Sequence, residues 1–487
     1  MEQDQAIIYW SNNDIVVSLP KKCRALENVL KYVKKDLVFD MRQRKRVTKK
    51  SVKHIFDVFS SPEDGRIVYH TFQGMIDTVV DVLKKEYPDK TFIYDQRLPV
   101  PLPDYSKLGG LRFNQEEVLR KGLDKNRSGL FKCPTRYGKT RLITNTINVY
   151  PTLKTVVLAP GVDLLPQTQS TIEQCCPGRK VAGLYTGSKD RFMSDDITVC
   201  SLDSMHKLDW ESVKLVLVDE PHSAVTESRA QYFPKFSNAR ILGYGATTDG
   251  RWGGEDILIT GLIGPVLSET TYTECVEMGA LCPIHVYMIK VPFEPKNYSR
   301  RDLAYKYLVQ QNHEFCDIVG HICNNVIPKD YQTLVFIENS NQAETLQKHV
   351  NDSVLAMDKL MKNKKERTDL FAKMQKNEIK RCICSNIYST GVTINDIRCE
   401  LNCCGGGAGI MATQKPGRLA EVKPNKPEGI MIDFLFQPTK GCSPQSGDAM
   451  VMRDSILRLE AYREKGYIVD VLEDYQQLKL NTENQND

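Results

Sequence analysis

The sequence lacks several patterns that would assign it to a specialised class of protein. No stretch of its 487 residues approaches the ~18 consecutive apolar residues that a membrane-spanning helix needs, so we expect no membrane partner. The first residues contain no basic segment followed by an apolar one, so we predict no signal peptide and a cytoplasmic location. No repeat of fixed period occurs.

The cysteines are spaced in a way that argues against a zinc site. The fifteen cysteines include no Cys-x-x-Cys pair, and the closest groupings lie at 175–176, 382–384 and 403–404. Adjacent and alternating cysteines are poorly spaced to bind zinc. Because free cysteine is among the most frequently buried residue types, we expect reduced, buried thiols and no disulfide-linked partner.

Length and composition indicate a globular protein of several domains. At ~100–200 residues per domain, 487 residues predict about three domains. The hydrophobic fraction is 41% and the charged fraction is 26%, which is ordinary for globular chains. These values exclude a largely disordered chain, a coiled-coil rod and a collagen-like fibre.

Positive charge is concentrated near the N-terminus. The formal net charge is only +5, but residues 42–53 contain seven basic residues and no acidic one. Like charges in so short a segment repel each other, so a polyanionic partner explains them better than a solvated face or a localisation signal does. The segment has no regular apolar stripe, so we expect a loop or hairpin that binds nucleic acid. The predicted contacts are Arg42, Arg44, Lys45, Arg46, Lys49 and Lys50.

Proline-rich stretches mark three candidate boundaries, because proline fixes φ and removes a hydrogen-bond donor. They lie at 97–104, 291–298 and 437–444. We predict the following division: an N-terminal accessory nucleic-acid-binding domain at 1–100, two α/β domains at 106–290 and 291–475, and a flexible tail at 476–487.

Short apolar runs between these boundaries are typical of buried strands. They lie at 155–159, 214–218, 333–337 and 429–433, and are continuous rather than alternating, as expected for strands covered on both faces. Helical patterns separate them, and a strand–helix–strand series forms a parallel sheet with right-handed crossovers. The predicted fold class is therefore α/β, with two parallel-sheet domains in tandem.

The segment before residue 140 has the layout of a phosphate-binding loop. Residues 129–135 are predicted to form a strand that enters a turn, and Gly138, Lys139 and Thr140 precede a helical segment. Backbone N–H groups at such a helix start bind phosphate, the lysine reaches the β- and γ-phosphates, and the threonine holds Mg²⁺. Arg136 stands where a first glycine is common, so the backbone conformation of the loop is an open question.

A pair of carboxylates follows the apolar run at 214–218. Asp219 and Glu220 come at the end of this predicted strand, and His222 follows them. At a strand end, Asp219 is placed to bind Mg²⁺, and Glu220 is placed to orient and deprotonate the water that attacks the γ-phosphate. Loop and carboxylates together predict one phosphoryl-transfer site that uses ATP and Mg²⁺.

With these motifs, residues 110–467 resemble the superfamily 2 nucleic-acid helicases of the DExH class. The segments that carry the resemblance are 111–115, 133–140, 157–161, 198–204, 219–222, 245–247, 335–337, 385–393 and 414–418. The resemblance implies two RecA-like domains and ATP hydrolysis that nucleic acid stimulates.

The resemblance also implies a role for individual residues. Catalytic roles fall on Lys139, Glu220, Gln414 and Arg418, and Arg418 is the candidate finger that stabilises the γ-phosphate. The implied ATP contacts are Gln115, Pro134, Thr135, Arg136, Tyr137, Gly138, Lys139, Thr140, Asp219 and Gly391, with Thr140 and Asp219 on the metal. The implied coupling residues are His222, Ala246 and Thr247. The implied contacts to the nucleic-acid backbone are Pro160, Gly161, Ser201, Ser204, Ser389 and Thr390.

Two further positions depart from the family pattern. Gly245 stands where the coupling motif usually begins with serine or threonine, and Glu421 replaces a further arginine three residues after Arg418. An arginine finger contributes ~10³–10⁵ in rate, so losing one of two slows hydrolysis. The candidate substitutes are Arg301, Arg367, Arg381 and Arg398.

Within the superfamily, the chain is similar to phage DNA helicases of the UvsW recombination type. The grounds are the small basic N-terminal module, the compact core domains and the connector from 259–264 through 278–283. This likeness implies a translocase in the host-cell cytoplasm that remodels branched duplex DNA, such as forks, junctions, D-loops or R-loops, in recombination, repair or replication. The alternatives are an RNA-directed helicase or transcript-release factor, and a nucleic-acid-binding scaffold with a degenerate ATP site.

Overall fold

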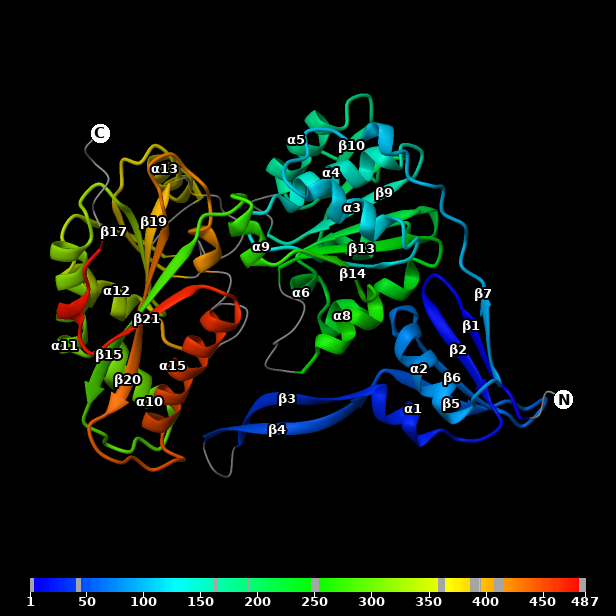
Figure 1. Ribbon diagram of the computed structural model, residues 1–487, viewed down its shortest axis with the longest axis horizontal. Coiled ribbons are helices and arrows are strands. Elements are labelled where there is room, and N and C mark those ends of the chain that lie inside the picture. Colours follow the sequence, from blue (N-terminus) through cyan, green and yellow to red (C-terminus); the bar gives the residue numbers. More distant parts are fainter. Residues whose placement is uncertain are drawn as a thin grey trace. The chain divides into compact units, whose positions relative to one another are not determined.

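The computed structural model describes residues 4–40, 45–161, 165–190, 192–246, 254–357, 364–385, 394, 396–406 and 415–480. The chain forms two compact units, of which the first comprises residues 1–134 and 138–270 and the second comprises 271–487 together with 135–137. Each unit contains a seven-stranded parallel sheet (Figure 1). The predicted α/β fold with two tandem RecA-like domains and a small N-terminal sheet domain is confirmed.

The N-terminal module is a five-stranded sheet in the order β5-β6-β2-β1-β7. Its elements are β1 (Ala6–Trp10), β2 (Asp14–Leu19), α1 (Arg24–Val29), β5 (Phe56–Ser60), β6 (Ile67–Phe72), α2 (Ile76–Glu86) and β7 (Thr91–Asp95). Along β2 the side chains of Ile15, Val17 and Leu19 are buried and alternate with partly exposed ones, as expected when helices cover one face of a sheet. Leu26 of α1 and Leu83 of α2 belong to the same apolar core.

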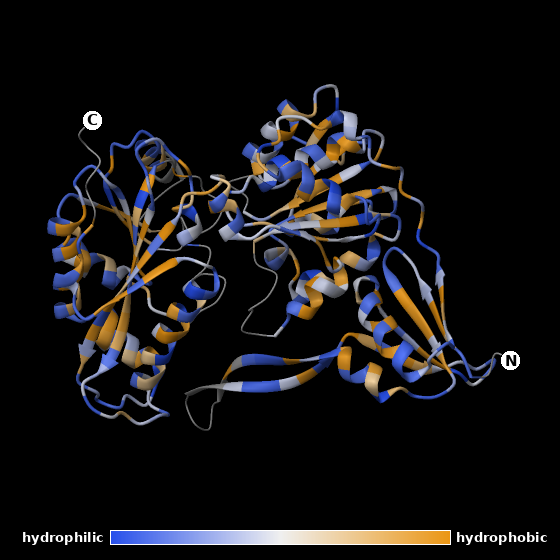
Figure 2. Ribbon diagram, in the orientation of Figure 1, coloured by the Kyte–Doolittle hydropathy of each residue, from blue (hydrophilic) through white to orange (hydrophobic). Residues whose placement is uncertain are grey.

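A long hairpin extends from this module after α1. Its strands are β3 (Lys31–Asp40) and β4 (Lys45–His54), which pair in antiparallel register from Lys31 opposite His54 to Asp40 opposite Lys45. Figure 1 shows the two strands as a ribbon of their own, and Figure 2 shows long hydrophilic stretches along it. The basic run therefore lies in a hairpin, although Arg42 and Arg44 fall outside the described residues.

The sheet of the first RecA-like domain has the strand order β10-β11-β9-β12-β13-β8-β14. Its strands are β8 (Gly129–Lys132), β9 (Thr155–Ala159), β10 (Val181–Leu184), β11 (Ile197–Ser201), β12 (Leu215–Asp219), β13 (Arg240–Gly245) and β14 (Val266–Glu269). Its helices include α3 (Gln115–Leu123), α4 (Lys139–Val149), α5 (Leu165–Cys175), α6 (Pro221–Ala224), α7 (Glu227–Ala230) and α8 (Asp256–Leu262). Because all neighbouring strands are parallel, their carboxyl ends meet at one edge, where ligands bind in open α/β sheets.

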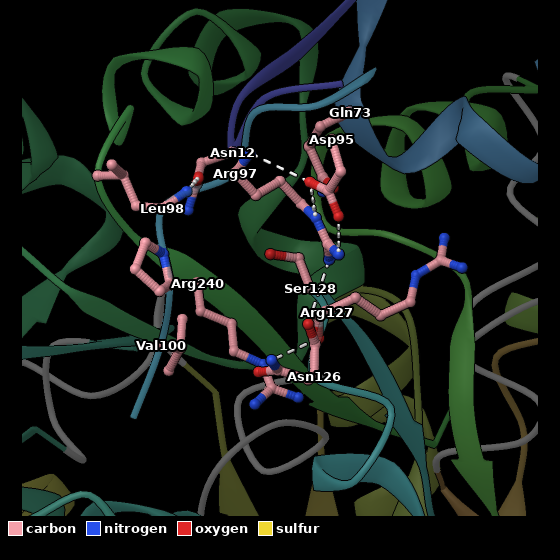
Figure 3. Close-up of a pocket in the computed structure, with 11 residues that line it drawn as sticks. Asn12, Gln73, Asp95, Arg97, Leu98, Val100, Asn126, Arg127, Ser128 and Arg240 are labelled. Atoms are coloured by element: carbon pink, nitrogen blue, oxygen red, sulfur yellow. Dashed lines mark hydrogen bonds and ion pairs between the residues drawn. The ribbon is translucent and has the colours of Figure 1, made fainter. Parts of the chain in front are cut away.

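The N-terminal module packs directly on this first domain. A polar cavity of about 160 Å³ lies where the two meet (Figure 3). Arg97 pairs there with Asp95 at 2.6 Å and donates to the carbonyl oxygen of Asn126 at 3.1 Å. Gln73 Nε2 donates to the carbonyl oxygen of Ile263 at 2.9 Å. The proline-rich connector therefore joins two parts that form one compact unit.

The sheet of the second RecA-like domain has the strand order β17-β18-β16-β19-β20-β15-β21. Its strands are β15 (Ile284–Phe293), β16 (Gln332–Phe336), β17 (Ser353–Ala356), β18 (Arg381–Cys384), β19 (Ile397–Asn402), β20 (Gly429–Pro438) and β21 (Ile468–Leu472). Its helices include α9 (Tyr272–Glu277), α10 (Arg301–Tyr305), α11 (His313–His321), α12 (Ser340–Gln347), α13 (Lys364–Gln375) and α15 (Gly447–Glu464). Among the described residues, no helix combines the length and the apolar character that crossing a bilayer requires.

The boundary between the RecA-like domains lies earlier in the chain than residue 290. The units divide between Thr270 and Thr271, and the whole of β15 belongs to the second sheet. Pro292, which suggested a break, lies near the end of β15, beyond the part that pairs with β21. A strand tolerates proline where one side is unpaired, because the missing N–H then breaks no ladder hydrogen bond.

Candidate ATP site and nucleic-acid contacts

The phosphate-binding loop joins β8 to α4 and has an unusual backbone. Arg136 has φ of +71° and Gly138 has φ of +101°, so both lie in the left-handed region that favours glycine. A non-glycine residue in this region costs ~1–3 kcal/mol. The loop adopts this conformation even though residue 136 is an arginine and not a glycine. Lys139 and Thr140 begin α4, and the start of a helix is a site where backbone N–H groups can bind an anion.

Gln115, the predicted adenine-reading residue, lies against this loop. It begins α3, and its Oε1 accepts a hydrogen bond from the backbone N–H of Arg112 at 2.9 Å. A Cβ atom added to Gly138 would lie 2.7 Å from Gln115 Nε2. Glycine is thus needed at 138 for its positive φ and because the side chain of Gln115 lies close to its Cα atom. Any side chain at 138 would displace Gln115.

The two carboxylates and the lysine meet at the carboxyl end of β12. Asp219 ends the strand, and Glu220 follows with φ of +50° while its N–H donates to the carbonyl oxygen of Tyr244 at 3.0 Å. The ammonium of Lys139 forms an ion pair with Glu220 Oε1. His222 Nδ1 lies 3.4 Å from Glu220 Oε2. Residues from two motifs some eighty positions apart therefore form one cluster, as the sequence predicts.

Electrostatics of this cluster favour a bound cation at Asp219. Burial, together with the negative charge of Glu220, raises the pKa of Asp219 to about 6, although Lys139 opposes the shift. Burial disfavours the charge on Lys139, but Glu220 and Asp219 outweigh it and raise the pKa of the ammonium. Glu220 Oε2 is buried and accepts no hydrogen bond from a described residue. The oxygen ligands that Mg²⁺ prefers are thus present beside a carboxylate able to accept a proton.

Packing explains the glycine at the start of the coupling motif. A Cβ atom on Gly245 would lie 2.9 Å from Pro221 Cδ, and one on Gly243 would lie 2.8 Å from Pro221 Cγ. Pro221 follows Glu220 directly and begins α6. The proline therefore occupies the space that a serine or threonine at 245 would fill. Ala246 follows Gly245, and Thr247 lies outside the described residues.

The predicted nucleic-acid contacts of the first domain differ in their exposure. Pro160 is partly exposed and Gly161 is exposed, directly after β9. Ser201 and Ser204 are instead buried, and the hydroxyl of Ser201 donates to that of Ser204 at 2.9 Å. Ser201 ends the fully buried strand β11, and Ser204 is buried in the 3₁₀ turn Leu202–Lys207 that follows it. The exposed residues of this turn are Asp203, His206 and Lys207, which the sequence motif did not single out.

Arg418, the predicted finger, lies in the second unit on a 3₁₀ turn, Pro416–Arg418. It is 6% exposed, and burial lowers the pKa of its guanidinium. Glu421 pairs with Lys423 at 3.1 Å. Three of the candidate substitutes are held by partners of their own: Arg301 by Asp454 at 2.7 Å, Arg381 by the carbonyl of Asn351 at 3.2 Å, and Arg398 by the carbonyl of Asn425 at 2.9 Å. The predicted sites Ser389, Thr390, Gly391 and Gln414 lie outside the described residues.

A buried hydrogen-bond network leads to the segment that carries Arg418. The guanidinium of Arg458 on α15 donates to both carboxylate oxygens of Asp433 on β20, at 2.8 and 2.9 Å. Asn402 Nδ2 donates to Asp433 Oδ2 at 3.0 Å, and Asn402 Oδ1 accepts from Lys415 Nζ at 3.3 Å. Since Lys415 directly precedes the turn with Arg418, the network connects α15 to that turn. No local sequence pattern predicts this network.

Two protein-family models match the chain over the regions just described. Residues 109–250 match the model for the res subunit of type III restriction enzymes, and residues 316–420 match the helicase conserved C-terminal domain. The chain belongs to the superfamily 2 helicases. The predicted class of enzyme, an ATP-hydrolysing helicase, is confirmed by these domains.

Individual relatives of this helicase are distant. The chain is 23% identical over 401 residues to the DNA 3'-5' translocase XPB2 of Sulfurisphaera tokodaii, across 73% of this chain and 88% of the relative. A fragment of an HsdR subunit of a type I restriction enzyme from Vibrio vulnificus has the same fold, with a TM-score of 0.56 at 14% identity over 92% of this chain and 79% of that chain. T4 UvsW aligns over 96% of this chain and 99% of its own, with 12% identity and a TM-score of 0.41.

Proposed function

We propose that this helicase couples ATP hydrolysis to movement along duplex DNA and thereby remodels branched DNA. The observation that carries the proposal is that the basic hairpin β3–β4 and the cluster of Lys139, Asp219 and Glu220 belong to the same compact unit. An element rich in positive charge is thus part of the unit that binds the nucleotide, where it can hold duplex phosphates during turnover. The XPB2 relative is named as a DNA translocase, which supports DNA over RNA as the substrate.

The ATP site supplies the groups that phosphoryl transfer needs. Thr140 and Asp219 would hold Mg²⁺, which when bound neutralises charge on the β- and γ-phosphates. Phosphate competes with Glu220 for Lys139, because both are anions that pair with the same ammonium. When Lys139 turns to the phosphates, Glu220 is released to take a proton from the attacking water. ATP binding therefore activates the base as well as placing the substrate.

The remaining roles in this proposal rest on the family resemblance. Gln115 reads the adenine, and Arg418 stabilises the charge on the γ-phosphate in the transition state. Pro160 and Gly161 contact the backbone of one strand. Backbone contacts carry no sequence information, which suits an enzyme that moves along any DNA.

ATP turnover on four nucleic acids tests this function. The substrates are a forked DNA duplex, a linear DNA duplex, single-stranded DNA and duplex RNA, all at saturating concentration. We expect the forked duplex to stimulate hydrolysis most. Equal or greater stimulation by RNA would assign an RNA-directed helicase instead, and binding of nucleic acid without ATP turnover on any of the four would indicate a scaffold with a degenerate ATP site.

A further inference from the structure

The hairpin β3–β4 has two faces with different surroundings. Side chains alternate along a strand, and directly opposed residues of an antiparallel pair share a face. By the register of the pair, the outer face comprises Lys31, Val33, Lys35, Thr48, Lys50, Val52 and His54, and all seven are exposed. The inner face comprises Tyr32, Lys34, Asp36, Val38, Lys49, Ser51 and Lys53, of which four are partly buried and Val38, Lys49 and Lys53 are exposed.

Carboxylates already pair with much of the positive charge on the inner face. Lys34 forms an ion pair with Glu227 on α7 and lies 3.3 Å from Asp36. Lys53 lies 3.8 Å from the other carboxylate oxygen of Glu227. The hydrogen bond to Glu227 raises the pKa of Lys34, although burial opposes the shift. Since α7 belongs to the first RecA-like domain, the inner face ties the hairpin to that domain.

Among the described residues, no carboxylate forms an ion pair with the lysines of the outer face. Lys35 and Lys50 lie directly opposite each other, and the face contains no acidic side chain. Like charges directly opposite destabilise a strand pair, so this arrangement favours a bound polyanion. An apolar cross-strand pair, Val33 and Val52, lies next to the pair of Lys35 and Lys50 along the hairpin. The side chains of Val33 and Val52 are 47% and 55% exposed. These aliphatic groups are suited to contact deoxyribose while the lysines reach phosphates.

We propose that the outer face of the hairpin is the surface that binds the phosphates of duplex DNA, while the inner face fixes the hairpin to α7. This assignment rests on the proposed function and names the residues through which it acts. A two-stranded ribbon is narrow enough to enter the major groove, which is about 12 Å wide. Lys31 and Lys35 are four residues apart, which corresponds to roughly 13 Å along a strand, so several lysines of this face can reach phosphates together.

A pair of double variants on the same two strands tests the assignment. Lys35→Ser with Lys50→Ser removes two charges from the outer face, and Lys34→Ser with Lys53→Ser removes two from neighbouring positions on the inner face. The readout is fluorescence anisotropy with a labelled linear DNA duplex, titrated with salt. The fall of log K with log salt becomes shallower by ~0.9 for each phosphate contact that is lost, so the slope of the outer variant should be shallower than that of the wild type by ~1.8. The inner variant should keep the wild-type slope.

Three results would overturn the face assignment. Equal losses in both variants would show that only net charge matters. A larger loss in the inner variant would place DNA on the opposite face. Unchanged slopes in both would mean that the lysines only keep the strand edges from pairing with another chain. The same titration with duplex RNA follows, and a preference of the outer face for RNA would assign that polymer instead.

Controls separate this result from a failure of the proposed function. Circular dichroism and thermal melting establish that both variants are folded. Wild-type ATP turnover is measured with the same duplex. No stimulation of the wild type would contradict the proposed function itself, whereas a stimulated wild type with indistinguishable variants contradicts only the assignment of the face.

Discussion

Replacing Arg458 with methionine should strongly destabilise the second unit. Arg458 is 2% exposed and its partner Asp433 is fully buried, so neither charge is solvated. The two hydrogen bonds between them, at 2.8 and 2.9 Å, provide the compensation for that burial. Methionine removes one partner and leaves the Asp433 carboxylate without a counter-charge, which costs ~3–5 kcal/mol. Hydrogen bonds from Asn402 cannot replace a positive charge.

Differential scanning calorimetry measures this loss. For a unit of about 200 residues, 1 kcal/mol shifts the melting midpoint by ~2–4 °C, so the expected drop is roughly 6–20 °C. Arg463→Met is the matched control, because Arg463 is an exposed residue on the same helix, and it should change stability by less than ~0.5 kcal/mol. Similar melting of the two variants would refute the claim that the buried pair supports the fold.

Three further predictions concern buried groups and the finger. Glu400 is fully buried and burial raises its pKa from 4.5 to about 8, so the folded state holds a proton that the unfolded state releases in this interval. The free energy of unfolding, measured with urea, should therefore fall by up to ~1.4 kcal/mol per pH unit as pH rises from 4.5 to 8. The Glu400→Gln variant should show a smaller fall. Gly245→Ser should destabilise by ~1–3 kcal/mol through the clash with Pro221, and Pro221→Ala in the same chain should restore the melting temperature. Arg418→Ala should lower ATP turnover by ~10³-fold or more with little change in ATP affinity; loss of affinity alone would contradict a finger role.

The elements with a local signature could be predicted from the sequence. The apolar run at 155–159 is β9, and the runs at 214–218, 333–337 and 429–433 lie in or beside β12, β16 and β20. Continuous apolar sequence is enough for such strands, because both faces of a parallel sheet are buried. The same logic placed Asp219 and Glu220 at a strand end next to the loop with Lys139, because carboxyl ends of parallel strands share an edge.

Features that depend on long-range packing could not be predicted. The ion pair between Lys34 and Glu227 joins residues 193 positions apart. The ion pair between Asp433 and Arg458 joins a strand to a helix, and no sequence motif links the two residues. The burial of Ser204 depends on a 3₁₀ turn, Leu202–Lys207, that its polar composition does not reveal. Gly245 departed from its motif because of Pro221, and only the packing of β13 against α6 shows why.

ATP hydrolysis in the presence and absence of forked duplex DNA tests the central claim most directly. The variants are Glu220→Gln, which keeps the size of the side chain but removes the base, and Glu211→Gln, a control at an exposed position of the same domain. The account predicts that the fork stimulates the wild type and the Glu211 variant equally. The Glu220 variant should bind ATP and the fork yet hydrolyse at the unstimulated rate or below. A folded Glu220→Gln protein that hydrolyses ATP at the wild-type rate on the fork would contradict the account.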